Sequence, residues 1–153
     1  MIETVDDIKT IANVGTGTMG HAITLQFALA GYPVHLVGRG EAILQALKDQ
    51  GIETLPKGVE IANADDVVDM HDDPATVVKK KKDSSMVVGL TMLKEGGGDA
   101  FVSAGSTGAL HVGASLIVRT LRGVKRPALA TMVPAKKQAY LLLDCGANVE
   151  LSL

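Results

Sequence analysis

Tryptophan is absent from this sequence, and phenylalanine and tyrosine occur only twice each. So few aromatic side chains cannot form the stacking platforms with which proteins hold single-stranded RNA. Charge of one sign is not in excess either, because the formal net charge is −2. That balance favours neither DNA nor an anionic membrane as a partner. We therefore expect no nucleic-acid partner.

Cysteine and long apolar runs are equally scarce. The single cysteine, Cys145, excludes an internal disulfide and is typical of a protein from a reducing compartment. No apolar run approaches the roughly 20 residues that a transmembrane helix needs, so no transmembrane segment is expected. Residues 1–7 are acidic and lack the basic and apolar regions of a signal peptide. These absences together predict a cytoplasmic protein.

Aliphatic residues are what the sequence has in quantity. Hydrophobic residues make up 46% of the 153 positions, enough for one domain with a core. Apolar runs predict strands at residues 10–14, 34–37, 59–62, 100–103, 129–133 and 140–143. Helices are expected at residues 18–30, 41–50, 74–82, 85–95 and 107–121, with N-cap chemistry at residues 83–85. This alternation predicts a single Rossmann-like α/β domain over residues 1–153, with a mostly parallel sheet.

A glycine-rich segment, GTGTMG at residues 15–20, lies between the first predicted strand and the first predicted helix. It fits the dinucleotide-binding pattern G-x-G-x-x-G. Gly15 would allow the tight turn, Gly17 the approach of a pyrophosphate, and Gly20 close packing of helix on strand. Arg39 follows the second predicted strand, where an NAD site expects an acidic residue, and suits the 2′-phosphate of NADP.

The stretch around these glycines, residues 11–22, resembles the N-terminus of the 3-hydroxyacyl-CoA dehydrogenase type of enzyme. The resemblance covers about residues 1–40 and implies a βαβ unit that binds NADP. The substrate domain of such an oxidoreductase is not recognisable here. Alternatively, the glycines only shape a strand-to-helix turn. His21 is interpreted as a surface or capping residue.

Four later segments carry a second resemblance. They are KKDSSM at residues 81–86, SAGSTGAL at 103–110, RPALAT at 126–131 and LDCGANV at 143–149. In this order and spacing they resemble the phosphate acyltransferase family of bacterial phospholipid synthesis, over about Val34 to Glu150. The resemblance implies a three-layer α/β/α sandwich, a homodimer, and transfer of a fatty acyl group from acyl-carrier protein to inorganic phosphate. It implies no metal or organic cofactor, because phosphate itself is the nucleophile.

The segment at residues 103–108 is predicted to lie between a strand and a helix. Its backbone N–H groups, with the Ser106 and Thr107 hydroxyls, could hold a phosphate or stabilise charge on a thioester oxygen. Arg126 contacts an anion or caps an element. Asp144 and Asn148 flank a glycine at a strand end, as active-site residues or turn formers.

The lysine run at residues 79–82 is interpreted as a solvated surface, with docking of the acidic carrier protein as the alternative. Cys145 is interpreted as an inert thiol. The sequence also departs from the transferase pattern. Residues 13–20 lack the two aspartates with which that family usually opens, and Ser106 stands where many members carry asparagine. We expect a truncated or composite chain, with the transferase-like section at residues 41–150.

Three functions are compatible with these observations. A phosphate acyltransferase-like protein, inactive if it is a fragment, is favoured. An NADP-binding module of a hydroxyacyl dehydrogenase-like oxidoreductase is the first alternative. A non-catalytic α/β scaffold, in which all the glycines are turn formers, is the second.

Overall fold

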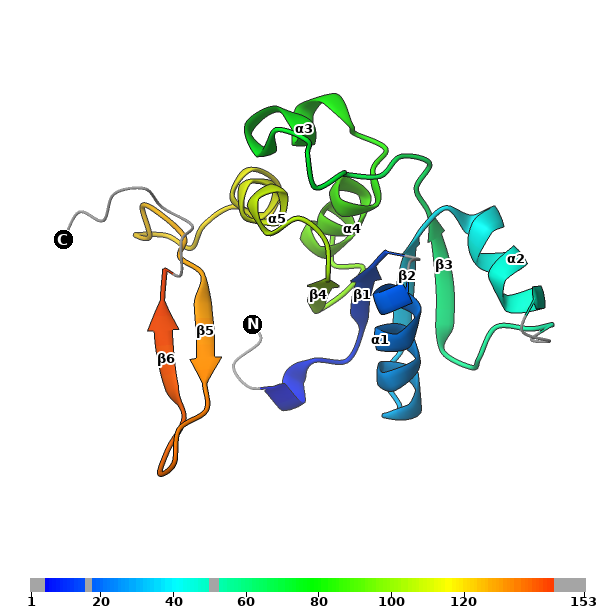
Figure 1. The fold of residues 1–153 in the computed structure, drawn as a ribbon, viewed down its shortest axis with the longest axis horizontal. Coiled ribbons are helices and arrows are strands. Elements are labelled where there is room, and N and C mark those ends of the chain that lie inside the picture. Colours follow the sequence, from blue (N-terminus) through cyan, green and yellow to red (C-terminus); the bar gives the residue numbers. More distant parts are fainter. Residues whose placement is uncertain (1–4, 16–17, 50–52, 145–153) are drawn as a thin grey trace. The chain divides into compact units, whose positions relative to one another are not determined.

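The computed structural model describes residues 5–15, 18–49 and 53–144. The chain divides into two compact units, Met1–Val118 (unit 1) and Arg119–Leu153 (unit 2). Unit 1 holds an α/β sheet with its helices, and unit 2 holds a hairpin (Figure 1). The single domain expected over residues 1–153 stays a prediction.

The sheet of unit 1 has four parallel strands in the order β3-β2-β1-β4. The strands are β1 (Ile11–Val14), β2 (Val34–Gly38), β3 (Val59–Asn63) and β4 (Ala100–Ser103). Every residue of β1 is buried, as expected of a central strand in a parallel sheet covered on both faces. Ile11 pairs with Val34 on one side and with Ala100 on the other. Strand order therefore reverses between β1 and β4.

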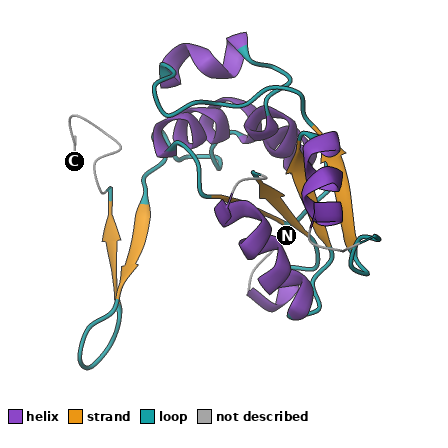
Figure 2. Cartoon of the chain, turned by 45° about the vertical axis from the view of Figure 1, so that its right-hand side comes forward, coloured by secondary structure: helices purple, strands orange, loops and turns teal. Residues whose placement is uncertain are grey.

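Helices cover both faces of this sheet (Figure 2). They are α1 (Thr18–Leu29), α2 (Gly40–Asp49), α3 (Pro74–Lys80), α4 (Ser85–Lys94) and α5 (Thr107–Gly113), with the short helices η1 (Val5–Asp7) and η2 (Ala114–Val118). On one face, Val14 and Val37 pack against α4. On the other, Leu36 and Val59 pack with Ile43 of α2. The predicted Rossmann-like α/β fold with a mostly parallel sheet is confirmed.

A further cluster of buried apolar residues joins three of these helices. Its buried residues are Val77, Val78, Met86, Leu90 and Ala109, from α3, α4 and α5. Pro74 opens α3 as predicted, and the Asp73 side chain accepts a hydrogen bond from the Ala75 N–H at its start. α3 and α5 thereby rest on α4, which itself rests on the sheet.

The end of unit 1 differs from its prediction. In place of one helix over residues 107–121, α5 ends at Gly113 and a π-helical turn, η2, follows it. The helical path stops at Arg119, whose φ of 74° is left-handed. Gly113 explains the close packing here, because a Cβ at this position would lie 2.7 Å from the Leu90 side chain.

The last two predicted strands form, but they do not extend the parallel sheet. β5 (Ala130–Val133) and β6 (Tyr140–Leu143) pair antiparallel, with Ala130 opposite Leu143. Residues 134–139 are too few for the crossover of about a dozen residues that a parallel pair requires. In unit 2 the βαβ pattern therefore gives way to a hairpin.

Candidate functional site in unit 1

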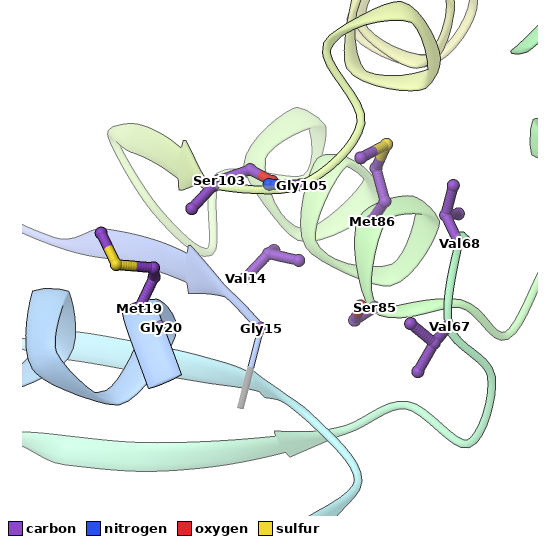
Figure 3. A pocket seen from close by; sticks show the side chains of 11 residues that line it. Val14, Gly15, Met19, Gly20, Val67, Val68, Ser85, Met86, Ser103 and Gly105 are labelled. Atoms are coloured by element: carbon purple, nitrogen blue, oxygen red, sulfur yellow. The ribbon is translucent and has the colours of Figure 1, made fainter. Parts of the chain in front are cut away.

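A cavity of about 310 Å³ lies at the carboxyl ends of β1 and β4 (Figure 3). This is the point at which strand order reverses, where ligands bind in open α/β sheets. Four segments contribute to the cavity: the β1–α1 turn, the loop after β3, the start of α4 and the β4–α5 loop. Its lining residues are Val14, Gly15, Met19, Gly20, Val67, Val68, Ser85, Met86, Ser103, Ala104 and Gly105.

The turn after β1 requires its glycines. Gly15 has a φ of +107°, and its N–H donates to the Val37 carbonyl at 3.1 Å. Gly20 lies in the first turn of α1. A Cβ at this position would lie 1.8 Å from the Gly15 carbonyl oxygen, so only glycine fits at position 20. The predicted turn at Gly15 and the close packing at Gly20 are therefore both present. Gly17 lies outside the described residues.

Asn13 fixes the start of α1 from within β1. Its buried side-chain amide donates to the Gly20 carbonyl and to the Thr24 hydroxyl, both at 2.6 Å. A polar side chain at the centre of a sheet needs such partners, because a buried amide without them is costly. The sequence pattern placed Asn13 only in an apolar run and did not predict this role. The available signal was an amide side chain inside that run.

The start of α4 is tied to the loop after β3. The Ser85 N–H donates to the Asp66 carbonyl at 3.1 Å, and the Asp66 N–H donates to the Asp83 carbonyl at 3.2 Å. Ser84 occupies the N-cap position, but its hydroxyl donates to the Lys81 carbonyl at 2.7 Å and makes no cap. The N-cap chemistry expected at residues 83–85 is thus wrong for the Ser84 side chain. These contacts hold Val67 and Val68 as one wall of the cavity.

Lys81 strengthens the same wall. Its Nζ donates to the Val67 carbonyl at 2.9 Å and to Asp72 Oδ2 at 2.7 Å, with Asp66 Oδ1 at 3.9 Å. The hydrogen bond from Lys81 lowers the pKa of Asp72, and the same bond raises the pKa of Lys81. The solvated surface expected for residues 79–82 therefore needs a correction at Lys81, which is partly buried and paired, whereas the other three lysines are exposed.

The β4–α5 loop contributes backbone and a hydroxyl to the cavity. Ser103 Oγ accepts from the Gly105 N–H at 3.1 Å. Ser106, largely buried, is the N-cap of α5, and its Oγ accepts from the Ala109 N–H at 3.4 Å. Thr107 is exposed. Ser106 and Thr107 thus lie next in the chain to the cavity, whose described lining takes Ser103, Ala104 and Gly105 from this loop.

The remaining candidate residues lie elsewhere. Arg39 is exposed directly after β2, and its carbonyl accepts from the Ile43 N–H at the start of α2. Arg126 is exposed in unit 2. Asp144, also in unit 2, follows β6 with a left-handed φ of 58°. Asn148 and Cys145 lie outside the described residues, and their roles stay predictions. His21 is exposed, as interpreted.

Two features are absent from the described part of the chain, a metal-binding group and a membrane-spanning helix. Among residues 5–15, 18–49 and 53–144, His, Cys, Asp and Glu form no group suited to a metal ion. Within the same part of the chain, no helix combines the length and apolar character needed to cross a bilayer.

Comparison with known proteins identifies relatives of most of the chain. The model of a family described as "Fatty acid synthesis protein" matches residues 18–153. A phosphate acyltransferase of Magnetococcus marinus is 48% identical over 117 residues, which is 76% of this chain and 33% of the relative. One of Caldicellulosiruptor bescii is 50% identical over 101 residues, 66% of this chain and 30% of the relative.

The chain thus spans about a third of the length of these curated relatives. The family match begins at Thr18, after Gly15 and Gly17 of the dinucleotide pattern. It gives no support to the NADP alternative, which rested on residues 1–40. It does include the start of α4, the β4–α5 loop and unit 2, the segments that carry the transferase resemblance. The chain belongs to the fatty acid synthesis protein family, whose matched relatives are named phosphate acyltransferases.

Proposed function

We propose that this chain takes part in phosphate acyl transfer, in which a fatty acyl group passes from acyl-carrier protein to inorganic phosphate. The observation that carries the proposal is the cavity at the strand-order reversal, which lies within the family match except for Val14 and Gly15. Relatives that match the chain are named phosphate acyltransferases. The product would be an acyl phosphate, and the pathway served would be phospholipid synthesis.

The lining of the cavity suits both halves of such a product. Five lining residues are valines or methionines: Val14, Met19, Val67, Val68 and Met86. They offer the apolar surface that the first carbons of an acyl chain would bury. Ser85 and Ser103 add hydroxyls to this surface. Ligand sites commonly combine apolar walls with a few placed polar groups, and a volume of about 310 Å³ falls at the small end of their range.

The proposed reaction needs no cofactor. A phosphate oxygen attacks the thioester carbonyl carbon, so a C–O bond forms and negative charge moves to the carbonyl oxygen. The C–S bond then breaks, and the thiolate of the carrier protein leaves and takes the proton that phosphate gives up. N–H and hydroxyl donors aimed at the carbonyl oxygen would lower the barrier. We propose this task for the β4–α5 loop, with Ser106 and Thr107.

We also propose roles for three residues that the family motifs single out in unit 2. Arg126 would contact an anionic oxygen, and Asp144 and Asn148 would be active-site residues. Trapping acyl phosphate with hydroxylamine, from acyl-carrier protein and phosphate, tests the proposal on the purified chain. Hydroxamate formation that falls in Ser106→Ala and Arg126→Ala supports both activity and site. Full activity in both variants contradicts the assignment of the site, and the lack of any product from a folded chain contradicts the activity.

The proposal extends to partners and compartment. An acyl-carrier protein is acidic, and exposed Lys79, Lys80 and Lys82 offer it a cationic surface.

A homodimer in the cytoplasm is proposed as well. Its support is β6, where the Tyr140, Leu141 and Leu143 side chains are half-exposed or more. Sedimentation equilibrium of the chain tests this, since a monomer at all concentrations would contradict it.

A further inference from the structure

The starts of α4 and α5 both follow loops that border the cavity, but only one of them is capped. At α5 the Ser106 hydroxyl accepts from the Ala109 N–H, and the helix spans only Thr107–Gly113. At α4 the N-cap hydroxyl of Ser84 is turned away to the Lys81 carbonyl. The first-turn N–H groups of α4 therefore lack the usual side-chain acceptor.

The N–H groups at this helix start can be followed one by one. Ser85 N–H donates to the Asp66 carbonyl, and Val88 N–H donates to the Ser84 carbonyl. Between them, Met86 N–H and Val87 N–H form no hydrogen bond within the described part of the chain. α4 runs for ten residues, Ser85–Lys94, so its dipole adds positive potential at this end. Met86 is buried and Val87 is partly buried, so their N–H groups call for an acceptor.

The Ser85 side chain is a second feature of this helix start that indicates a ligand. It is only 7% exposed and lines the cavity, at the first turn of α4 (Figure 3). Its hydroxyl makes no hydrogen bond to any described residue, unlike Ser84, Ser103 and Ser106. A hydroxyl on a cavity wall that has no partner within the described residues is available to donate a hydrogen bond to a ligand.

The lining of the cavity indicates the charge of that ligand. None of the described residues that line the cavity carries a charged side chain, so no carboxylate would repel an anion. Met19 and Gly20, in the first turn of α1, lie on the opposite wall, and α1 also presents its positive end. Two helix N-termini and the Ser85 hydroxyl thus meet at a cavity whose described lining is uncharged. That arrangement holds oxyanions through N–H and O–H donors.

We propose that Ser85 and the first-turn N–H groups of α4 bind the phosphoryl group of the substrate. This deepens the proposed function and rests on it, and it moves the phosphate from the start of α5 to the start of α4. The β4–α5 loop is then left for the thioester oxygen. Inorganic phosphate and the phosphoryl end of acyl phosphate share the chemistry that this subsite recognises.

Calorimetric titration with inorganic phosphate, at constant ionic strength, tests the proposal on the purified chain. The variant is Ser85→Ala, which removes one hydroxyl from the first turn of α4. The matched control is Ser115→Ala, because the Ser115 hydroxyl donates to the His111 carbonyl, away from the lining. Circular dichroism establishes that each variant is folded. A parallel titration with methyl phosphate separates the free ion from a phosphoryl group that carries a substituent.

We expect Ser85→Ala to bind phosphate about tenfold more weakly, the loss typical of one hydrogen bond to a charged group, and Ser115→Ala to bind like the wild type. Methyl phosphate binding with the same dependence on Ser85 supports a site for either phosphoryl group, and its exclusion supports a site for the free ion. Equal binding in Ser85→Ala and wild type, or no binding by the folded wild type, overturns the proposal.

The outcome is separable from that of the proposed function. Ser85-dependent phosphate binding without acyl phosphate formation upholds the subsite and contradicts the activity. Acyl phosphate formation with an unchanged KM for phosphate in Ser85→Ala upholds the activity and contradicts the subsite.

Discussion

Gly20 faces Gly15 so closely that a Cβ at position 20 would lie 1.8 Å from the Gly15 carbonyl oxygen. The contact joins the first turn of α1 to the end of β1, where both glycines line the cavity. It also brings the Gly20 carbonyl within 2.6 Å of the Asn13 side-chain amide. The shape of one wall of the site thus depends on a hydrogen atom at position 20.

Gly20→Ala should therefore destabilise the chain by about 3 kcal/mol, the upper part of the usual cost of overpacking, because backbone rather than a flexible side chain must move. Urea unfolding followed by circular dichroism measures the change. Gly98→Ala is the matched control, since its Cβ would meet Ala12 only at 3.6 Å, an ordinary contact. Equal stability of the two variants would show that α1 does not approach β1 as closely as described.

Lys81→Met should loosen the loop after β3. The substitution keeps an apolar stem but removes the hydrogen bonds from Lys81 Nζ to Val67 and Asp72. The Asp69 N–H, which donates to Asp72 Oδ2 at 2.7 Å, should then exchange with deuterium faster. Lys80→Met, at an exposed neighbour, should leave that exchange unchanged. The same exchange rate in both variants would contradict a special role for Lys81.

The Lys81–Asp72 pair stabilises the folded chain fully only within a range of pH. Because the pKa of Asp72 is lowered from 3.8, its contribution to stability is present above that value and is lost as pH falls through the lowered pKa. Because the pKa of Lys81 is raised from 10.5, its contribution is present below that value and is lost as pH rises through the raised pKa. The protection of the Asp69 N–H, measured as its exchange rate relative to the intrinsic rate at the same pH, should hold across the interval between.

Asp99 predicts an acid-dependent loss of stability. Its Oδ2 accepts from the N–H groups of Lys9 and Thr10, both at 2.9 Å, and these bonds lower its pKa from 3.8. The stabilisation is therefore present above 3.8 and is lost as pH falls through the lowered pKa. Wild type should be more stable than Asp99→Asn at neutral pH, and the gap should shrink in acid. Unfolding free energies measured against pH check this, and a gap that stays constant would be the contrary result.

The sequence predicted helices and strands better than their contacts. Residues 100–103 and 140–143 become strands with the predicted bounds, because short apolar runs and the glycines around them are local signals. The antiparallel pairing of β5 with β6 was missed, because the alternation of strands and helices was extended to the last two strands. The short connection at residues 134–139 excludes a parallel pair. The Asn13 and Lys81 contacts were missed because they depend on which polar atoms the folded chain brings together.

The candidate site divides in the same way. The family motifs singled out the β4–α5 loop and the glycine pattern singled out Gly15 and Gly20, and both segments contribute to the lining of the cavity. The roles expected for these residues stay predictions. They did not single out Ser85, because "KKDSSM" contains two serines and only the folded backbone decides which hydroxyl is turned to the Lys81 carbonyl. The Ser106 hydroxyl, which the motifs did single out, also accepts a hydrogen bond at the start of α5, and its O–H group is the donor in the proposed reaction.

The most direct test concerns the proposal that the cavity at the carboxyl ends of β1 and β4 binds the acyl phosphate. It is a titration of the isotopically labelled chain with a non-hydrolysable acyl phosphonate, followed by amide NMR. We expect progressive shifts of the Gly15, Gly20, Ser85 and Gly105 amide signals, and no shifts from α2, which contributes no residue to the described lining. Saturating ligand that leaves these four signals in place, or shifts only signals remote from the cavity, would contradict the proposal.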